Sequence, residues 1–419
     1  MNVIQIFDRI PLHGRVKIQG SKNASLPIMA AALLTYERSS LRNCPRITDV
    51  YDMAELLRTI GCEVKWMECG LEIQPPQTKM CCLLNENGKV RGMRSSICLL
   101  GALLGRCGAV YMEYPGGCVI GERPIDLHRQ ALEKMGVQFR DWDRGFLAYA
   151  DCLHGADINL PIPSVGATEN VIMAAVAAEG RTVINGAAKE PEIVSLCTYL
   201  KQCGAQIEGE GSDRISIEGG RKLYGTEYNI PADRIVAGTY LFTCIGAGGD
   251  IFLENAPADD MAAVLETAAL MGAELEQTAE GIYVLAPVKP KSIELIKTGY
   301  YPEFPTDLQS VALAVECMGD GETEVSETVF EDRFKIVPEL KKMGAEIEIV
   351  SPDRVRIQGV DHLHGADVTA RELRGGAALV TAGCMATGKT SVCGTQYIAR
   401  GYENICRDLQ ELGARILSE

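Results

Sequence analysis

One short segment, PGGCVIGERPIDLH at 115–128, gathers residues that could do chemistry. Cys118 follows two glycines, and Arg123, Asp126 and His128 come within the next ten residues. A buried thiol needs no such neighbours, because it behaves as a small apolar side chain. A thiol beside a guanidinium in an irregular, Gly- and Pro-rich loop is expected to be exposed and reactive, since a nearby cation stabilises the thiolate. The segment therefore predicts a reactive cysteine rather than a passive one, whereas a lone histidine such as His128 is more often structural than catalytic.

A duplicated unit is expected to position these residues. A helix that ends in glycine and is followed by an apolar strand recurs about every 70 residues, a period typical of a repeated folding unit. The glycines are Gly61, Gly136, Gly204, Gly272, Gly344 and Gly413. Glycine after a helix readily adopts the left-handed cap, and the alternating residues that follow indicate a strand. A helix of small residues precedes each piece, so we expect six α/β units, three in each of two domains that join near 229–238.

The residues at which the first helix of each unit begins suggest a negatively charged ligand. The six starts are Lys22, Arg94, Ser164, Arg234, Asp307 and Arg374. Four are cations at the positive end of a helix dipole, where a cation costs roughly 0.3–1 kcal/mol. Because helix N-termini attract phosphate and carboxylate, four cations in one register predict a negatively charged ligand beside them. The alternative for Asp307 is a helix N-cap.

Composition excludes several classes of protein. The 419 residues exceed the size of a single core, and 47% of them are apolar, which is enough for two domains. The net charge of −15 argues against a nucleic-acid partner, because phosphate backbones need a basic face. Sixteen scattered cysteines without a CxxC pair, and no apolar run long enough to span a bilayer, favour a reduced, cytoplasmic protein.

Metal and nucleotide cofactors lack support. The five histidines have no metal-ligand spacing, so no metal site is expected. GCMATGKT at 383–390 matches the phosphate-loop pattern, but a phosphate loop follows a strand and opens a helix. Here the segment should end a helix and lead into a strand. We therefore interpret it as a turn of the repeat.

Eight segments together give the chain a close resemblance to a known enzyme family. They are GSKNASLPIMAAALL, MRSSICLLGALL, PGGCVIGERPIDLH, PSVGATENVIMAA, KEPEIV, FPTDLQ, ETVFEDRF and IARGYENI. The chain resembles the UDP-N-acetylglucosamine enolpyruvyl transferases (1-carboxyvinyltransferases) over essentially its whole length. This implies two inside-out α/β barrel domains of three repeated units each. The first would be 22–230 and the second 1–21 plus 231–419, with both termini in the second and the active site in the cleft between them.

The resemblance also implies a reaction. The enolpyruvyl group of phosphoenolpyruvate would pass to the 3′-hydroxyl of UDP-N-acetylglucosamine with release of phosphate, the first committed step of peptidoglycan synthesis. No metal or organic cofactor would be needed. The partners would be these two small molecules, with no nucleic acid and no membrane, and the chain is expected to be a monomer. Two anionic substrates would explain why cations cluster in an acidic protein.

Residue roles follow from the same resemblance. The expected catalytic residues are Cys118, Asp307, Lys22, Arg123 and Arg400. Cys118 would protonate the methylene carbon of phosphoenolpyruvate or form a thioether with it, on a loop that closes as a lid, and fosfomycin would alkylate it. Asp307 would accept the 3′-hydroxyl proton. The residues expected to bind the substrates are Lys22, Asn23, Arg94, Arg123, Pro124, Ile125, Asp126, Leu127, Ser164, Val165, Gly166, Asp307, Val329, Arg333 and Arg374. Of these, 123–127 would surround the uracil and 164–166 would meet the diphosphate.

Two positions depart from the family pattern, and two alternatives stay open. Some members have lysine where this chain has Thr48 and Ile162, so phosphate contacts are not expected there. The nearest alternative is the enolpyruvyl transferase that acts on shikimate 3-phosphate, which lacks a cysteine loop of this kind. The other is a non-catalytic paralogue that binds the sugar nucleotide. Because all the residues expected to act in the reaction are present, an enzyme is favoured; they are Lys22, Cys118, Asp307, Arg374 and Arg400.

Overall fold

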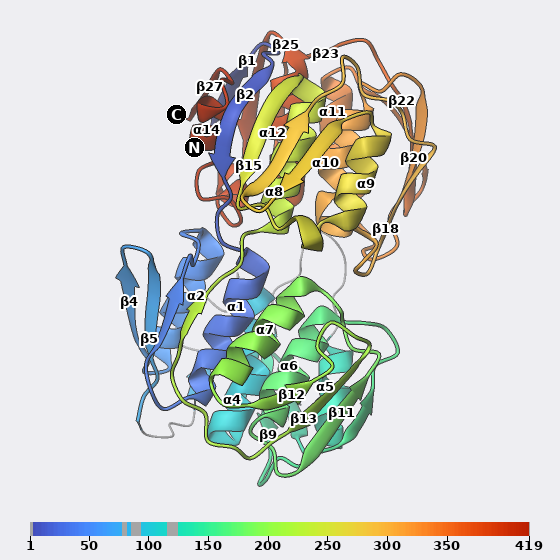
Figure 1. Ribbon diagram of the computed structural model, residues 1–419. Coiled ribbons are helices and arrows are strands. Elements are labelled where there is room, and N and C mark those ends of the chain that lie inside the picture. Colours follow the sequence, from blue (N-terminus) through green and yellow to red (C-terminus); the bar gives the residue numbers. More distant parts are fainter. Residues whose placement is uncertain (1–2, 78–81, 85–93, 115–124, 419) are drawn as a thin grey trace. The chain divides into compact units, whose positions relative to one another are not determined.

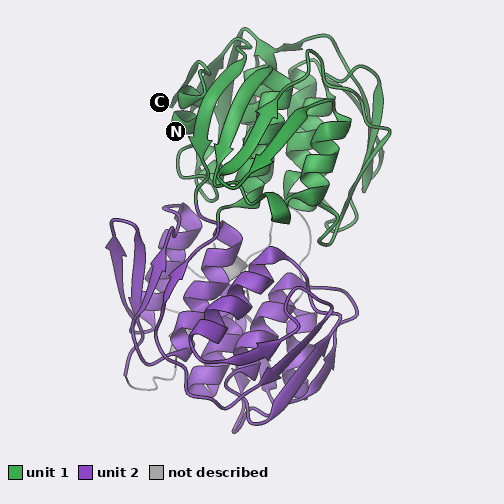
Figure 2. Cartoon of the chain, in the orientation of Figure 1, with its two compact units in different colours: residues 1–19, 119–122, 232–419 green, residues 20–118, 123–231 purple. Residues whose placement is uncertain are grey.

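The protein consists of two compact units, seen in a computed structural model that describes residues 3–77, 82–84, 94–114 and 125–418 (Figure 1). Within these residues, unit 1 contains 3–19 and 232–418, and unit 2 contains the rest (Figure 2). The sequence predicts a domain at 22–230. Unit 2 begins at residue 20 and ends at residue 231.

Unit 2 contains three four-stranded sheets with one pairing pattern. In each sheet the first two strands are parallel and the last two are antiparallel to their neighbours. The sheets are β14 (Glu227–Asn229), β3 (Ser39–Arg42), β5 (Gly70–Gln74), β4 (Glu63–Met67); β6 (Cys82–Leu84), β7 (Ala109–Glu113), β9 (Gly145–Tyr149), β8 (Gln138–Trp142); and β10 (Asp157–Asn159), β11 (Arg181–Asn185), β13 (Arg214–Glu218), β12 (Gln206–Glu208). The last strand, β14, pairs with β3, so the end of the unit completes its first sheet.

Unit 1 repeats this pattern three times, with an additional parallel strand, β19, in its second sheet and a rearrangement in its third. Its sheets are β2 (Leu12–Lys17), β15 (Gly249–Glu254), β17 (Gly281–Leu285), β16 (Glu274–Thr278); β19 (Phe304–Pro305), β18 (Leu295–Gly299), β20 (Glu322–Ser326), β22 (Arg354–Gln358), β21 (Glu346–Ser351); and β24 (Asp367–Thr369), β26 (Lys389–Cys393), β1 (Ile4–Phe7), β27 (Ile416–Ser418). Two short strands, β23 (Leu363–His364) and β25 (Ala386–Thr387), form a separate parallel pair. In the third sheet β1 is antiparallel to both β26 and β27, with Ile4 opposite Ser418. The two ends of the described chain therefore meet in one sheet.

The first helix of each repeat forms the core, and the sheets lie outside (Figure 1). These helices are α1 (Lys22–Ala31, continued by η1, Ala32–Leu34), η2 (Arg94–Cys98) with α4 (Leu99–Cys107), α6 (Val165–Ala175), α8 (Arg234–Ala247), α10 (Thr306–Glu316) and α12 (Leu373–Met385). Every residue of α12 is buried, and α8, α10 and α12 pack on one another. Small residues make this possible: a side chain at Gly101 would collide with the backbone of Asn170, and one at Gly238 would collide with Leu308. The fold is therefore two inside-out α/β barrels.

The predicted repeat is confirmed at both of its landmarks. Each of the six predicted helix starts lies within one residue of the first residue of a helix. The second helices are α2 (Thr48–Thr59), α5 (Asp126–Lys134), α7 (Pro191–Gln202), α9 (Ala262–Leu270), α11 (Val337–Lys342) and α14 (Ile405–Glu411). The glycine after each has a positive φ, from 91° at Gly61 to 104° at Gly204. Shorter helices are η3 (Ala258–Asp260), η4 (Phe334–Ile336) and α13 (Thr395–Ile398).

The phosphate-loop match is a turn, as predicted. Helix α12 ends at Met385, and Gly388, with a φ of 85°, leads into β26. Within the described ranges, no helix is long and apolar enough to cross a membrane, and no group of three or more His, Cys, Asp or Glu side chains could hold a metal ion.

Candidate active site

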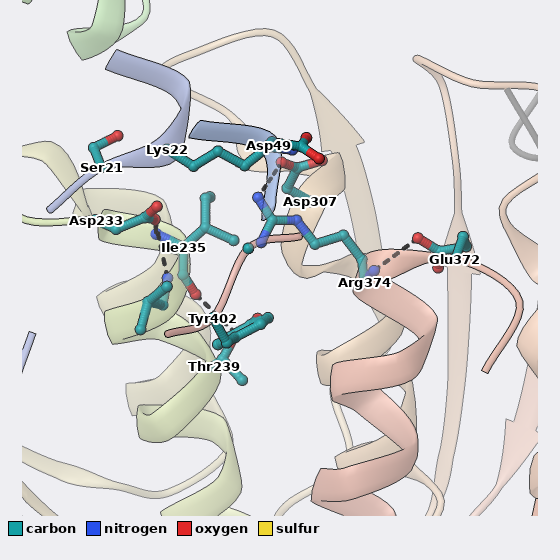
Figure 3. Close-up of polar contacts among 12 residues, drawn as sticks. Ser21, Lys22, Asp49, Asp233, Ile235, Thr239, Asp307, Glu372, Arg374 and Tyr402 are labelled. Atoms are coloured by element: carbon teal, nitrogen blue, oxygen red, sulfur yellow. Dashed lines mark hydrogen bonds and ion pairs between the residues drawn. The ribbon is translucent and has the colours of Figure 1, made fainter. Parts of the chain in front are cut away.

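Asp307 lies between two buried arginines of unit 1 (Figure 3 shows Arg374). It is the second residue of α10, where its Oδ1 accepts a hydrogen bond from Nη2 of Arg333 at 2.9 Å and its Oδ2 accepts one from Nη2 of Arg374 at 2.8 Å. The N-cap alternative is wrong, because Pro305 occupies the cap and no side chain caps this helix. The Asp307 side chain is 26% exposed, whereas those of Arg333 and Arg374 are 2% and 4% exposed. The carboxylate is therefore the accessible edge of a buried ion-pair cluster.

Arg374 is held by the start of its own helix. Glu372 is the N-cap of α12, and its carboxylate accepts hydrogen bonds from the N–H groups of Arg374 and Gly375 (Figure 3). Burial by itself would lower the pKa of Arg374, but the charge of Asp307, followed by Tyr402 and Asp233, raises it overall. Nη1 of Arg374 is buried and has no hydrogen-bond partner in the described part of the chain.

The two arginines carry no surplus charge. Nη1 of Arg333 lies 3.9 Å from Oε2 of Glu372, so two guanidinium groups face two carboxylates, those of Asp307 and Glu372. The ring of Phe330 lies 5.0 Å from the Arg333 guanidinium and covers it. The positive charge that anionic substrates require must therefore come from further residues. Arg400, half-buried just after α13, is one candidate.

In unit 2, Lys22 is also paired with a carboxylate. It is the first residue of α1, and its Nζ lies 3.0 Å from Oδ2 of Asp49 (Figure 3). Asp49 is 2% exposed and lies in the first turn of α2, where the helix dipole favours a negative charge. Ser21 caps α1 through a hydrogen bond from the N–H of Ala24, and Asn23 is half-buried beside Lys22. Sequence reasoning missed Asp49, whose only signal is an acidic residue at a helix start.

The expected uracil and diphosphate residues of unit 2 come from two neighbouring helix starts. Ser164 caps α6 through the N–H of Ala167. Before and at the start of α5, Ile125 is buried, Asp126 is exposed and Leu127 is half-buried. His128 packs against the start of α6, since a Cβ added to Gly166 would lie 3.0 Å from its Nε2. The structure thus brings 125–127 and 164–166 together.

Three buried carboxyl groups lie near these helix starts and were not predicted as site residues. Glu169 is on α6, Glu190 is the N-cap residue of α7, and Glu192 is in its first turn. Burial raises the pKa of Glu169 to about 8, and the charges of Glu192 and Glu190 add to the effect. Glu169 is therefore mostly protonated at neutral pH and does not repel an anion. The segment KEPEIV, which contains two of the three, was the available signal.

Several predicted site residues cannot be placed. Cys118, Arg123 and Pro124 lie outside the described residues, and Arg94 begins η2 without a described side chain. Of the two positions that depart from the family pattern, Thr48 is the first residue of α2 and Ile162 is 46% exposed.

The fold is that of the enolpyruvyl transferases. The enolpyruvyl transferase NikO from Streptomyces tendae superposes with a TM-score of 0.89 at 22% identity, covering 100% of this chain and 98% of NikO. An EPSP synthase from Acinetobacter baumannii superposes with a TM-score of 0.77 at 18% identity over 100% of both chains. At these identities the likeness shows the fold alone.

The sequence itself identifies the family. Residues 8–409 match the model of EPSP synthase (3-phosphoshikimate 1-carboxyvinyltransferase), and the chain belongs to this family. Curated relatives include a UDP-N-acetylglucosamine 1-carboxyvinyltransferase 2 from Carboxydothermus hydrogenoformans, 43% identical over 97% of this chain and 96% of the relative. A second protein of that name, from Caldanaerobacter subterraneus, is 42% identical over 97% of both chains. A UDP-N-acetylglucosamine 1-carboxyvinyltransferase from Desulfovibrio desulfuricans is 40% identical over 100% of both.

Proposed function

We propose that this protein transfers the enolpyruvyl group of phosphoenolpyruvate to the 3′-hydroxyl of UDP-N-acetylglucosamine and releases phosphate, the first committed step of peptidoglycan synthesis. Relatives at 40–43% identity over nearly full length carry the name of this activity. The observation that carries the proposal is the part-exposed Asp307 carboxylate, which the buried arginines Arg333 and Arg374 hold in place. The carboxylate could accept the proton of the sugar hydroxyl, and nearby guanidinium groups suit a phosphorylated acid such as phosphoenolpyruvate.

Asp307 would act as the base for the sugar hydroxyl. Its carboxylate is part-exposed, and a carboxylate oxygen can accept more than one hydrogen bond, so a substrate hydroxyl can donate to it. An ordinary aspartate carboxylate is a weak base. Its contribution therefore depends on holding the hydroxyl close to the reacting carbon, which can supply much of the rate acceleration.

The proposed reaction has two steps, an addition and then an elimination. The O3′–C2 bond forms while Cys118 protonates the methylene carbon, and Asp307 takes the hydroxyl proton. The methyl group then returns a proton to Cys118, the bond from C2 to the phosphate oxygen breaks, and the hydroxyl proton leaves with phosphate. Lys22, Arg123 and Arg400 would bind phosphoenolpyruvate and stabilise the charge that develops on it. This scheme involves no cofactor.

Phosphate release tests the proposal against its alternatives. The purified chain is given phosphoenolpyruvate with UDP-N-acetylglucosamine, with shikimate 3-phosphate, or alone. We expect turnover only with the sugar nucleotide. The family model bears the shikimate enzyme's name, so turnover with shikimate 3-phosphate would favour that activity instead. Binding of UDP-N-acetylglucosamine without phosphate release would favour a non-catalytic paralogue.

A matched pair of variants tests the role of Asp307. Asp307→Asn keeps the shape of the side chain but removes the base, and general-base catalysis contributes about 10²–10⁴-fold. We expect kcat of the variant to decrease by a factor within this range. Asp361→Asn changes an aspartate that is 85% exposed and paired with Lys289 in the same unit, and it should leave kcat unchanged. Fosfomycin sensitivity, roles in cell shape and division, a cytoplasmic location and a monomeric state stay predictions.

A further inference from the structure

Glu327 is a buried carboxylate that lies next to the proposed site but contacts no cation in the described part of the chain. It directly follows β20 and is 2% exposed. Its Oε1 accepts hydrogen bonds from the N–H groups of Val329 at 2.8 Å and Phe330 at 3.1 Å. Its Oε2 accepts one from Oγ1 of Thr306 at 2.9 Å. A buried charge is costly unless it is well hydrogen-bonded, and here three neutral donors satisfy it.

These bonds decide what the turn at 328–330 can offer a ligand. The N–H of Thr328 donates to Oγ1 of Thr298 at 3.0 Å, so the amide donors of all three turn residues are already used. Val329 is half-buried, and no described residue donates to its carbonyl oxygen. The turn therefore presents a hydrogen-bond acceptor. A substrate group that binds here must be a donor, such as an amide N–H or a hydroxyl.

The same carboxylate ties the turn to the helix that carries Asp307. Thr306 is the first residue of α10 and Asp307 is the second, and this helix has no side-chain N-cap. A second connection runs from Phe330 through Arg333 to Asp307. Glu327 thus sets the position of the Val329 carbonyl relative to the Asp307 carboxylate.

We infer that Glu327 is a positioning residue for the nucleotide sugar: it holds the Val329 carbonyl and the start of α10 in the arrangement that binds the sugar. The inference rests on the proposed function, because it takes UDP-N-acetylglucosamine as the ligand. Glu327 itself touches no substrate in this scheme. It acts through the turn and through Thr306.

Three variants separate positioning from stability. Glu327→Ala removes all three hydrogen bonds that hold the turn and Thr306, and a loss of about tenfold or more in affinity for UDP-N-acetylglucosamine is expected. Glu327→Gln keeps the shape; its oxygen can accept from the turn, and its NH₂ can donate to Thr306. It should restore the affinity to near the wild-type value. Thr306→Val breaks only the link to α10 and should give a smaller loss.

The matched control is Glu316→Ala at the other end of α10. Glu316 is also a fully buried glutamate that accepts from a threonine hydroxyl, Oγ1 of Thr323 at 2.6 Å. Titration calorimetry gives the Kd for UDP-N-acetylglucosamine, steady-state assays give KM and kcat, and thermal unfolding gives stability. We expect both alanine variants to lower the melting temperature but only Glu327→Ala to raise Kd and KM for the sugar nucleotide.

The outcomes distinguish this inference from the proposed function. An unchanged Kd in Glu327→Ala, or an equal rise in Glu316→Ala, would overturn the inference while leaving the activity intact. If Glu327→Ala does not fold, unchanged affinity in Thr306→Val together with weak affinity in Glu327→Gln would overturn it. A wild-type chain that binds the sugar nucleotide without releasing phosphate would reject the proposed activity, and the Kd comparison would still test Glu327. A wild-type chain that does neither would reject both.

Discussion

The clearest stability prediction concerns Glu316, the last residue of the helix that carries Asp307. Its side chain is fully buried in unit 1, and its Oε2 accepts a hydrogen bond from Oγ1 of Thr323. Burial raises the pKa of Glu316 from 4.5 to about 7, against the lowering effect of the hydrogen bonds from Thr323 and the Ile293 backbone, while Asp320 raises it further. The folded state therefore keeps a proton that the unfolded chain loses at lower pH.

The sign and size of the effect follow from this difference. Below pH 4.5 both states are protonated, so Glu316 adds no pH dependence. Between 4.5 and 7 the unfolded chain binds fewer protons, so stability falls as pH rises, and the loss is complete above the folded pKa. A rise of this size corresponds to about 3 kcal/mol. Glu316→Gln removes the titration, so the variant should gain about 3 kcal/mol relative to the wild type between pH 4.5 and pH 8.

Denaturant unfolding of both proteins across this pH range measures the effect. The quantity to compare is the difference in unfolding free energy between variant and wild type at each pH, because other titrating groups cancel in it. Glu346→Gln, at an exposed position of β21 in the same unit, is the matched control and should give a flat difference. A flat difference for Glu316→Gln as well would refute the claim that this buried carboxyl is protonated in the folded state.

Three further predictions concern the site and the chain topology. Cys118→Ser should nearly abolish turnover, whereas Cys118→Asp should keep some activity and resist fosfomycin; a wild-type enzyme left unmodified by excess fosfomycin would contradict the role of this thiol. Lys22→Met removes the cation that lies 3.0 Å from the buried Asp49 carboxylate, and loss of one partner of a buried ion pair should lower stability, by about 3–5 kcal/mol at most. Unfolding should show the double variant with Asp49→Asn recovering much of this loss but not activity, and equal stability of the single and double variants would contradict the pairing. Because Ile4 lies opposite Ser418, a chain with its ends joined by a short linker and reopened in the exposed loop between β12 and β13 should fold with a native circular dichroism spectrum. An unfolded permutant would contradict the claim that the pairing of β1 with β27 does not depend on where the chain is opened.

The repeated architecture could be predicted from the sequence because its signals are local. Glycine caps such as Gly61 and Gly204 are required by a positive φ, and small-residue helices are required by close packing, so both recur in every unit. The resemblance added the class of reaction and the site residues. Residues 115–124, Cys118 and Arg123 among them, lie outside the described part of the chain, so their roles still rest on that resemblance.

The partners of the charged residues could not be predicted, because they lie far away in the sequence. From the sequence, Asp307 could have capped its helix as well as accepted a proton. Only the packing shows that its carboxylate faces Arg374, which is 67 residues away. No sequence pattern singled out Glu327 or Glu372. Only the fold shows that their carboxylates accept hydrogen bonds from backbone N–H groups, those of Val329 and Arg374 among them.

By itself, the sequence determined the six repeats, the helix starts and the residue types at them, because caps, periodicity and turn chemistry act between residues a few positions apart. The tertiary structure decided which carboxylate faces which cation, how much of that charge is left for a ligand, and where β1 inserts between β26 and β27. Such pairings depend on the direction of side chains across packed helices and sheets, and no local pattern in the chain encodes that direction.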